Sequence, residues 1–364
     1  MINEIDILTA EAVELLKEMV AIPSPSFDED KVCTHISNWL NNKGVTHYRK
    51  GNNIIAEHIA DPSKPTLMLC AHIDTVAPCD GYTFDPYRPE NCPADMVQGL
   101  GSNDDGGCVV SMIAVFRHFC TKTSTSVISS EAEKSPNLLL VLSCEEERSG
   151  KNGMTGLWAE IKDKVDFAIV GEPTCMKAAT AERGLLVIDA TAHGVSGHAA
   201  RNEGVNAITI ALEDIRTLQN HVFSRVSPRM GKVNLNVTQI NAGTAHNVIP
   251  DICTFVIDIR PTEQYTNEEI LAELQSICKS NLKARNLSNR SSATFQDSLL
   301  QKRAEELGIE TFSSPTTSDW MRISCDAVKM GPGDSSRSHK KDEFVYVSEI
   351  ENGIKTYIDF IKEL

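Results

Sequence analysis

Three apolar runs in this sequence are each followed directly by side chains that can bind metal ions. The runs are Leu67–Ala71, Leu138–Leu142 and Asp166–Val170. The side chains that follow them are His72 and Asp74, then Glu145–Glu147, then Glu172. Short apolar runs predict buried strands, and open α/β sheets collect ligands at the carboxyl ends of their strands. Imidazole and carboxylate groups gathered at one sheet edge therefore predict a metal site.

His72 and Asp74 stand two residues apart, so both side chains can point to the same side of a strand end. A carboxylate beside a metal-binding imidazole fixes the ring tautomer and raises its basicity. Asp74 could serve His72 in this way, or act on the neighbouring base. A simple turn that holds a hydrogen-bonded His–Asp pair is the alternative, and this pair alone does not decide between them.

The acidic triplet Glu145–Glu147 follows a predicted buried strand, where three adjacent carboxylates repel each other. Such repulsion is costly unless cations or protons relieve it. One of the two later glutamates can bind a metal ion while its neighbour acts as a general base on water. A solvated acidic turn is the alternative. Glu172 supplies a further carboxylate at the end of the next predicted strand.

A glycine-rich turn, Gly99–Gly107, contains Asp104 and leads into a predicted helix. Its glycines let the backbone pass close to a ligand. Asp104 also suits a helix N-cap, which is the alternative. A phosphate loop is disfavoured, because the turn lacks the lysine of that motif. His339 follows the Gly331–Gly333 turn, and a lone histidine in a loop is usually solvated.

The composition argues against several classes of protein. The chain has 364 residues and a net charge of -15, with no basic stripe that could neutralise nucleic-acid phosphates. No apolar run approaches the roughly 18 residues of a membrane helix, and the acidic N-terminus does not resemble a signal peptide. The 11 cysteines are scattered without a CxxC pair, which favours a reducing cytoplasm over a disulfide framework.

The order of predicted elements indicates an α/β fold with two domains. In residues 1–179 strands alternate with helices, which predicts a mostly parallel mixed sheet flanked by helices. Residues 180–292 follow a β-α-β-β-α order, typical of a small two-layer α+β domain with an antiparallel sheet. Because helix and strand character returns in residues 293–364, we expect the small domain to be an insertion. The polar runs Thr121–Pro136 and Asn281–Ser292 are predicted to be a surface loop and a return linker.

A series of short motifs occurs in the order found in the co-catalytic zinc amidohydrolases, which this sequence resembles over about residues 10–364. The motifs are AHIDTV, GLGSNDDGG, SCEEE, VGEPT, GVSGHAA, NVIPD, DIR, TSD and GPG…SH. That family includes acetylornithine deacetylase, succinyl-diaminopimelate desuccinylase, aminoacylase and glutamate-type carboxypeptidases. The sequence is most similar to the branch of the first two. This resemblance implies a zinc-peptidase-like catalytic domain with an inserted lid and dimerisation domain.

The resemblance also implies a ligand set for two Zn²⁺ ions, which Co²⁺ or Mn²⁺ could replace. His72 and Glu172 would bind one ion. Glu147 and His339 would bind the other, and Asp104 would bridge the two.

Further matched positions would act on the substrate. Glu146 would be the general base, and Asp74 would support the metal-binding imidazole. His198 would reach across a dimer to the reacting carbonyl. Arg260 and Asn247 would contact the substrate carboxylate or polarise the scissile group.

The implied activity is hydrolysis of the amide bond of an N-acyl amino acid, as in amino-acid biosynthesis and arginine biosynthesis in particular. The acyl group would be acetyl or succinyl, and the amino acid ornithine, citrulline or diaminopimelate. A metallo-dipeptidase or carboxypeptidase of the same family is the alternative, and a noncatalytic metal-dependent binding protein is a remote one. The implied partner is a second copy of the chain, bound through the inserted domain.

Three positions depart from the commoner patterns of the family. Leu100 follows the first glycine of the glycine-rich turn, Glu145 opens the acidic triplet, and Trp320 follows Asp319. None of them removes a ligand. Trp320 is expected to reshape the substrate pocket, because a small residue is usual at its position.

Overall fold

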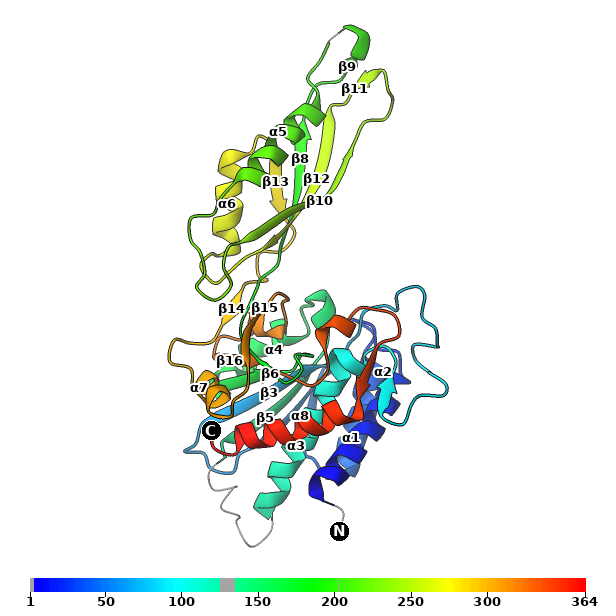
Figure 1. The fold of residues 1–364 in the computed structure, drawn as a ribbon, viewed down its shortest axis with the longest axis vertical. Coiled ribbons are helices and arrows are strands. Elements are labelled where there is room, and N and C mark those ends of the chain that lie inside the picture. Colours follow the sequence, from blue (N-terminus) through cyan, green and yellow to red (C-terminus); the bar gives the residue numbers. More distant parts are fainter. Residues whose placement is uncertain (1–2, 125–134, 202) are drawn as a thin grey trace. The chain divides into compact units, whose positions relative to one another are not determined.

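The computed structural model describes residues 3–124, 135–201 and 203–364. The chain divides into two compact units (Figure 1). The first unit comprises residues 1–180, 294–312 and 318–364, and the second comprises residues 181–293 and 313–317. The polar run predicted as a surface loop begins inside a helix, because Thr121–Ser124 belong to α3. Residues 125–134 of that run lie outside the described part of the chain.

The first unit is built on a mixed sheet whose central strands are parallel. In spatial order its strands are β1 (Tyr48–Lys50), β2 (Asn53–His58), β5 (Asn137–Ser143), β3 (Thr66–His72), β6 (Phe167–Val170), β16 (Asp326–Lys329), β7 (Ala178–Glu182) and β14 (Ser292–Ala293), with β15 (Thr311–Ser314) beside β7. Strands β5, β3, β6 and β16 pair in parallel, whereas β1, β2, β7 and β14 pair antiparallel. The predicted mostly parallel mixed sheet is confirmed.

Apolar side chains cover both faces of this sheet. Leu67, Leu69 and Ala71 of β3 join one core, and the alternate residues Met68 and Cys70 join another. Helices α1 (Glu4–Val20), α2 (Asp30–Asn42), α3 (Gly107–Ser124), α7 (Leu299–Glu306) and α8 (Val347–Ile361) contribute to the first core. Helix α4 (Met154–Ile161) and the 3₁₀ turn η5 (Asp319–Arg322) cover the other face.

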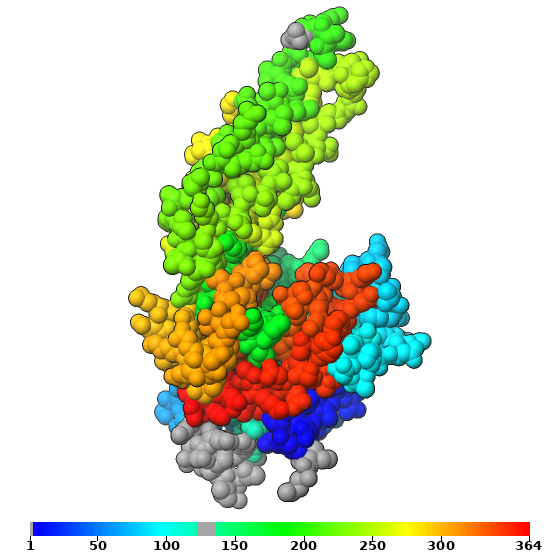
Figure 2. Space-filling model, viewed as in Figure 1, coloured from blue at the N-terminus to red at the C-terminus, as the bar shows by residue number. Residues whose placement is uncertain are grey.

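The C-terminal segment, which contains β17 (Phe344–Tyr346) and α8, packs into the first unit. Helix α8 packs against both α1 and α3. Figure 2 shows the C-terminal residues, in red, beside the N-terminal residues, in blue. Strand β17 also pairs with β4 (Met96–Gln98). The loop that carries His339 is thereby fixed near the glycine-rich turn, although about 235 residues separate the two in sequence.

The second unit is a two-layer α+β structure, as predicted. Its antiparallel sheet has the order β10 (Asn234–Ala242), β12 (Ile252–Arg260), β8 (Leu186–His193) and β13 (Asn281–Ala284). Helices α5 (Ala207–Asn220) and α6 (Asn267–Ile277) share one apolar core with this sheet. A short ribbon joins β9 (Gly197–His198) to β11 (Val248–Ile249).

The stretch from Asn281 to Ser292 differs from expectation. The prediction of Asn281–Ser292 as a linker was wrong at both ends, because Asn281–Ala284 form strand β13 and Ser292 begins β14. Leu282 of β13 is buried, so pairing with β8 and one apolar contact outweigh the polar composition of the run.

Among the described residues, no helix is both long and apolar enough to span a bilayer.

Candidate metal centre

His72 and Asp104 meet at the carboxyl edge of the central sheet. His72 is the last residue of β3, and its Nε2 lies 3.2 Å from Oδ1 of Asp104. Its other ring nitrogen, Nδ1, lies 3.0 Å from the backbone oxygen of Asp74. Both His72 and Asp104 are buried. Burial disfavours protonation of the imidazole, but the Asp104 and Asp74 carboxylates hold the pKa of His72 well above its ordinary value.

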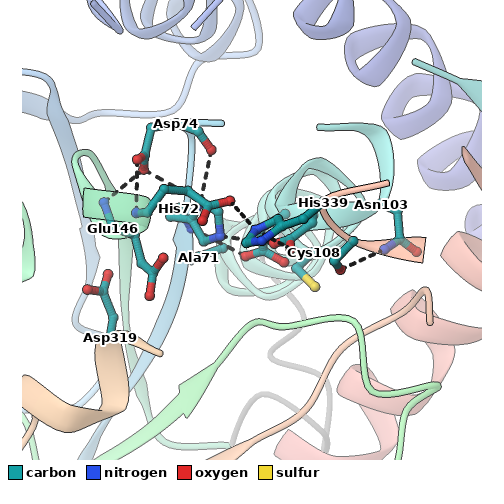
Figure 3. Close-up of polar contacts among 12 residues, drawn as sticks. Ala71, His72, Asp74, Asn103, Cys108, Glu146, Asp319 and His339 are labelled. Carbon is teal, nitrogen blue, oxygen red and sulfur yellow. Dashed lines mark hydrogen bonds and ion pairs between the residues drawn. The ribbon is translucent and has the colours of Figure 1, made fainter. Parts of the chain in front are cut away.

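Glu147 and His339 complete the cluster from two other segments, and the ring of His339 is labelled in Figure 3. His339 Nε2 lies 3.0 Å from Oε1 of Glu147 and 3.6 Å from Oδ2 of Asp104. The two oxygens of Asp104 therefore each face a different imidazole. Among the described residues, His72, Asp104 and Glu147 each offer one ligand atom, and these atoms all lie within 4.8 Å of one another.

Asp74 connects two of the strand ends. Its Oδ1 accepts a 3.0 Å hydrogen bond from the backbone N–H of Glu146, and its Oδ2 accepts one of 3.1 Å from that of Glu147. Oδ2 also accepts a 2.7 Å bond from the hydroxyl of Ser26. Burial raises the pKa of Asp74, but these donors and His72 hold it below its ordinary value. Asp74 therefore orients the acidic turn as well as the imidazole.

The acidic triplet is not a solvated turn. Glu145 is buried, and its carboxylate accepts hydrogen bonds from the backbone and side chain of Asn152. Its own N–H donates to the fully buried Glu29 carboxylate over 3.2 Å. Glu145 adopts a positive φ of 59° and begins the 3₁₀ turn η2 (Glu146–Arg148). From this turn the Glu147 side chain reaches the ligand cluster.

Two carboxyl groups near the ligand cluster, those of Glu146 and Glu172, have raised pKa values. Burial raises the pKa of Glu146 well above its ordinary value, and the Glu172, Asp319 and Glu147 carboxylates add to this against the opposing effect of His72. Burial likewise raises the pKa of Glu172, with Asp104 adding to the shift and Lys329 opposing it. Cations placed among these groups would relieve the repulsion.

Sequence reasoning missed the residues that fix the glycine-rich turn. Oε1 of the buried Glu343 accepts 2.9 Å hydrogen bonds from the backbone N–H groups of both Asn103 and Asp104. The Asn103 side chain bonds both the N–H and the oxygen of Asp334, in the loop that carries His339. These contacts span more than 200 residues, so no local pattern could have revealed them. Asp104 faces two imidazoles rather than capping α3, which begins at Gly107.

Trp320 does not line the site, contrary to expectation. Its side chain is 1% exposed and belongs to the core under one face of the sheet. Trp320 shares this core with apolar residues of α4 and of the strands β2, β3, β5, β6 and β16. The unusual residue therefore changes the packing beneath the site rather than the shape of a pocket.

The three remaining predicted residues lie in the second unit. His198 of β9 pairs with Val248 of β11, and the backbone oxygen of Asn247 accepts a 3.0 Å hydrogen bond from Ala199. His198 and Asn247 are both exposed on this ribbon. Arg260 ends β12, roughly 27 Å from the start of that strand at about 3.4 Å per residue. Its guanidinium makes two hydrogen bonds to Asp258, of 2.9 and 3.1 Å.

Comparison with known proteins relates both units to peptidases. Residues 180–286 match the peptidase dimerisation domain, and residues 53–163 match peptidase family M28. The chain is 26% identical to an acetylornithine deacetylase from Proteus mirabilis, with 93% of each chain covered. It is 27% identical to a succinyl-diaminopimelate desuccinylase from Corynebacterium glutamicum, with 94% of each covered.

Solved structures share the fold at low sequence identity. An M20 family metallo-carboxypeptidase from Sulfolobus solfataricus superposes with a TM-score of 0.75 at 16% identity, covering 97% of this chain and 98% of that one. The aminopeptidase PepT from Bacillus cereus gives a TM-score of 0.76 at 16% identity, covering 98% of each. These relatives confirm the resemblance stated from the motifs, and they are hydrolases.

Proposed function

We propose that this chain, a relative of the M20 family hydrolases, cleaves the amide bond of an N-acyl amino acid at a pair of divalent cations. The observation that carries this proposal is the Asp104 carboxylate, which faces His72 with one oxygen and His339 with the other. A carboxylate shared between two sets of ligands suits a two-metal site.

The donor set fits zinc, and cobalt or manganese could replace it. Imidazole nitrogens and carboxylate oxygens are ligands for these ions. We assign His72 and Glu172 to one ion and Glu147 and His339 to the other, with Asp104 as the bridge. When bound, the ions would supply Lewis acidity to the substrate carbonyl and lower the pKa of a water molecule.

Glu146 acts as the general base in this proposal. Its carboxylate takes a proton from the attacking water and later gives it to the leaving amine. Burial raises the pKa of Glu146, which makes its carboxylate a stronger base toward water. Asp74 supports the step by holding the backbone of Glu146 and the ring of His72.

The first unit is the catalytic domain in this proposal, and the second is a lid and dimerisation domain inserted at residues 180–292. His198 and Asn247 share one ribbon, whereas Arg260 ends the neighbouring strand β12. We infer that a homodimer allows one subunit to offer His198 and Asn247 while Arg260 contacts the substrate carboxylate. The match to the peptidase dimerisation domain supports the homodimer.

The substrate class comes from the relatives. An acetylornithine deacetylase and a succinyl-diaminopimelate desuccinylase each match almost the whole chain, so N-acetyl and N-succinyl derivatives of ornithine and diaminopimelate are proposed first. Derivatives of citrulline, which is chemically close to ornithine, are proposed beside them. A dipeptidase or carboxypeptidase is the second candidate, since similar folds occur in a metallo-carboxypeptidase and in human carnosine dipeptidase 1. The scattered cysteines, which include no CxxC pair, support a cytoplasmic location.

A substrate panel tests the proposal. The purified chain, loaded with Zn²⁺, is assayed for release of free amine from N-acetyl and N-succinyl amino acids and from dipeptides. Hydrolysis of an N-acyl amino acid at a kcat/KM well above that of any dipeptide is expected. A preference for dipeptides favours the second candidate, and metal binding without any hydrolysis favours a noncatalytic metal-dependent binding protein.

A further inference from the structure

Asp319 is a buried acid next to the proposed base, and the proposed mechanism gives it no role. It opens the turn η5 and is 6% exposed. Figure 3 shows its carboxyl group near that of Glu146, close enough for the two charges to act on each other. Asp319 comes from the C-terminal part of the first unit, whereas Glu146 follows β5. The fold therefore brings two carboxyl groups together from segments more than 170 residues apart.

Asp319 is anchored through its carboxyl group, whereas Glu146 is anchored through its backbone N–H. The hydroxyl of Ser143, which is fully buried at the end of β5, donates a 2.6 Å hydrogen bond to Oδ2 of Asp319. The next residue, Trp320, is packed into the core, and its backbone N–H donates a hydrogen bond to the Ser318 hydroxyl. Glu146 sits on a single 3₁₀ turn with a longer side chain. Because the Asp319 carboxyl group is hydrogen-bonded and the Glu146 side chain is the longer one, repulsion between them displaces the Glu146 carboxylate more readily.

The charge of Asp319 differs from the other negative charges around Glu146. Glu147 and Glu172 are also negative charges near Glu146, but we assign both as metal ligands, so cations would neutralise them. Asp319 is not a ligand in that assignment. Burial raises the pKa of Asp319 to about 6, so the group carries its charge above pH 7. Asp319 would therefore remain a negative charge beside Glu146 when the ions are bound.

We propose that Asp319 is a positioning residue, whose fixed negative charge repels the Glu146 carboxylate and keeps it turned toward the ligand cluster. This inference rests on the proposed function of Glu146 as the general base. A purely structural role for Asp319, as an acceptor for Ser143, is the competing explanation. The two explanations predict opposite orders of activity for two substitutions.

Asp319→Asn and Asp319→Ala separate these explanations. An amide at position 319 still accepts from Ser143, but its N–H₂ can donate to the Glu146 carboxylate and draw it away from the ligands. Alanine removes the repulsion without adding an attraction. A positioned general base contributes roughly 10²–10⁴-fold, so we expect kcat at pH 8 to fall about tenfold for Asp319→Ala and about 100-fold for Asp319→Asn. KM and the number of bound metal ions should stay unchanged.

Crystal structures of the metal-loaded wild type and Asp319→Asn give a readout independent of turnover. The Glu146 carboxylate is expected within hydrogen-bond distance of the amide at position 319 in the variant only. Ser143→Ala, which keeps the charge but removes its anchor, is expected to lower kcat less than Asp319→Asn. It also provides a test if the Asp319 variants do not fold.

Several results would overturn the inference. They are a lower kcat for Asp319→Ala than for Asp319→Asn, wild-type kcat in Asp319→Asn or in Ser143→Ala, and loss of metal from either Asp319 variant. Glu146→Gln, assayed in parallel, separates this inference from the proposed function. Full activity in Glu146→Gln removes the proposed base itself, whereas an inactive Glu146→Gln beside a fully active Asp319→Asn removes only the role of Asp319.

Discussion

Replacing Asp74 with asparagine should weaken metal binding, because Asp74 holds two strand ends in place through both of its oxygens. Oδ1 accepts from the Glu146 N–H, and Oδ2 accepts from the Glu147 N–H and the Ser26 hydroxyl. An amide offers only one oxygen. In either orientation of the new side chain, one backbone N–H of the acidic turn would face an N–H₂ group instead of an acceptor.

The magnitude follows from the burial of this contact. Asp74 is 1% exposed, and leaving a buried donor without an acceptor costs about 1–3 kcal/mol. If this cost falls on the arrangement that binds metal, about 1.4 kcal/mol corresponds to a tenfold loss of affinity. We therefore expect Asp74→Asn to bind Zn²⁺ about 10- to 100-fold more weakly, which is also the typical effect of removing a carboxylate that supports a metal ligand.

Competition with a chromophoric chelator measures this change, and Ser26→Ala is the matched control. The control removes one hydroxyl donor from the same carboxylate and leaves its charge, so its effect should stay near the 0.5–1.5 kcal/mol typical of an ordinary hydrogen bond, or roughly 2- to 12-fold. The reasoning is refuted if Asp74→Asn binds Zn²⁺ within twofold of the wild type. It is also refuted if Ser26→Ala has the larger effect.

Three further predictions concern the base, the exposed imidazole and the second unit. Glu146→Gln should lower kcat by roughly 10²–10⁴-fold with unchanged metal content, and a fully active variant would exclude it as the base. The hydrogen bond to Glu147 raises the pKa of His339 to about 8, so the metal-free protein gains stability from protonated His339 below pH about 6.5 and loses it as pH rises through 8. Because a metal ligand must be neutral, Zn²⁺ affinity should rise with pH up to about 8 with release of a proton, and a pH-independent affinity between pH 6 and 8 would contradict this. His198→Ala should lower turnover strongly without loss of zinc, whereas unchanged turnover would make His198 an ordinary surface residue.

The sequence predicts the strand ends of the site because each of them follows an apolar run. His72 ends β3, and Glu146 and Glu147 follow β5, as the runs Leu67–Ala71 and Leu138–Leu142 predict. Parallel pairing of β3 with β5 then brings these ends to one edge. Local periodicity and the direction of pairing are sufficient for this part of the arrangement.

The contacts that support the site escape sequence reasoning for a physical reason. Glu343, Asn103 and Asp319 are buried polar groups whose partners lie far away in the chain. Burial of such groups depends on partners that only the completed fold supplies, so neither composition nor periodicity marks them. Strand β13 was missed for a related reason, because pairing with β8 orders a stretch whose own composition is that of a loop.

A metal-loaded crystal measured at the zinc absorption edge tests the central claim most directly. The account predicts two anomalous peaks per chain on either side of the Asp104 carboxylate, one beside His72 and the other beside His339. A single peak remote from Asp104, or two peaks that leave either imidazole uncoordinated, would contradict it.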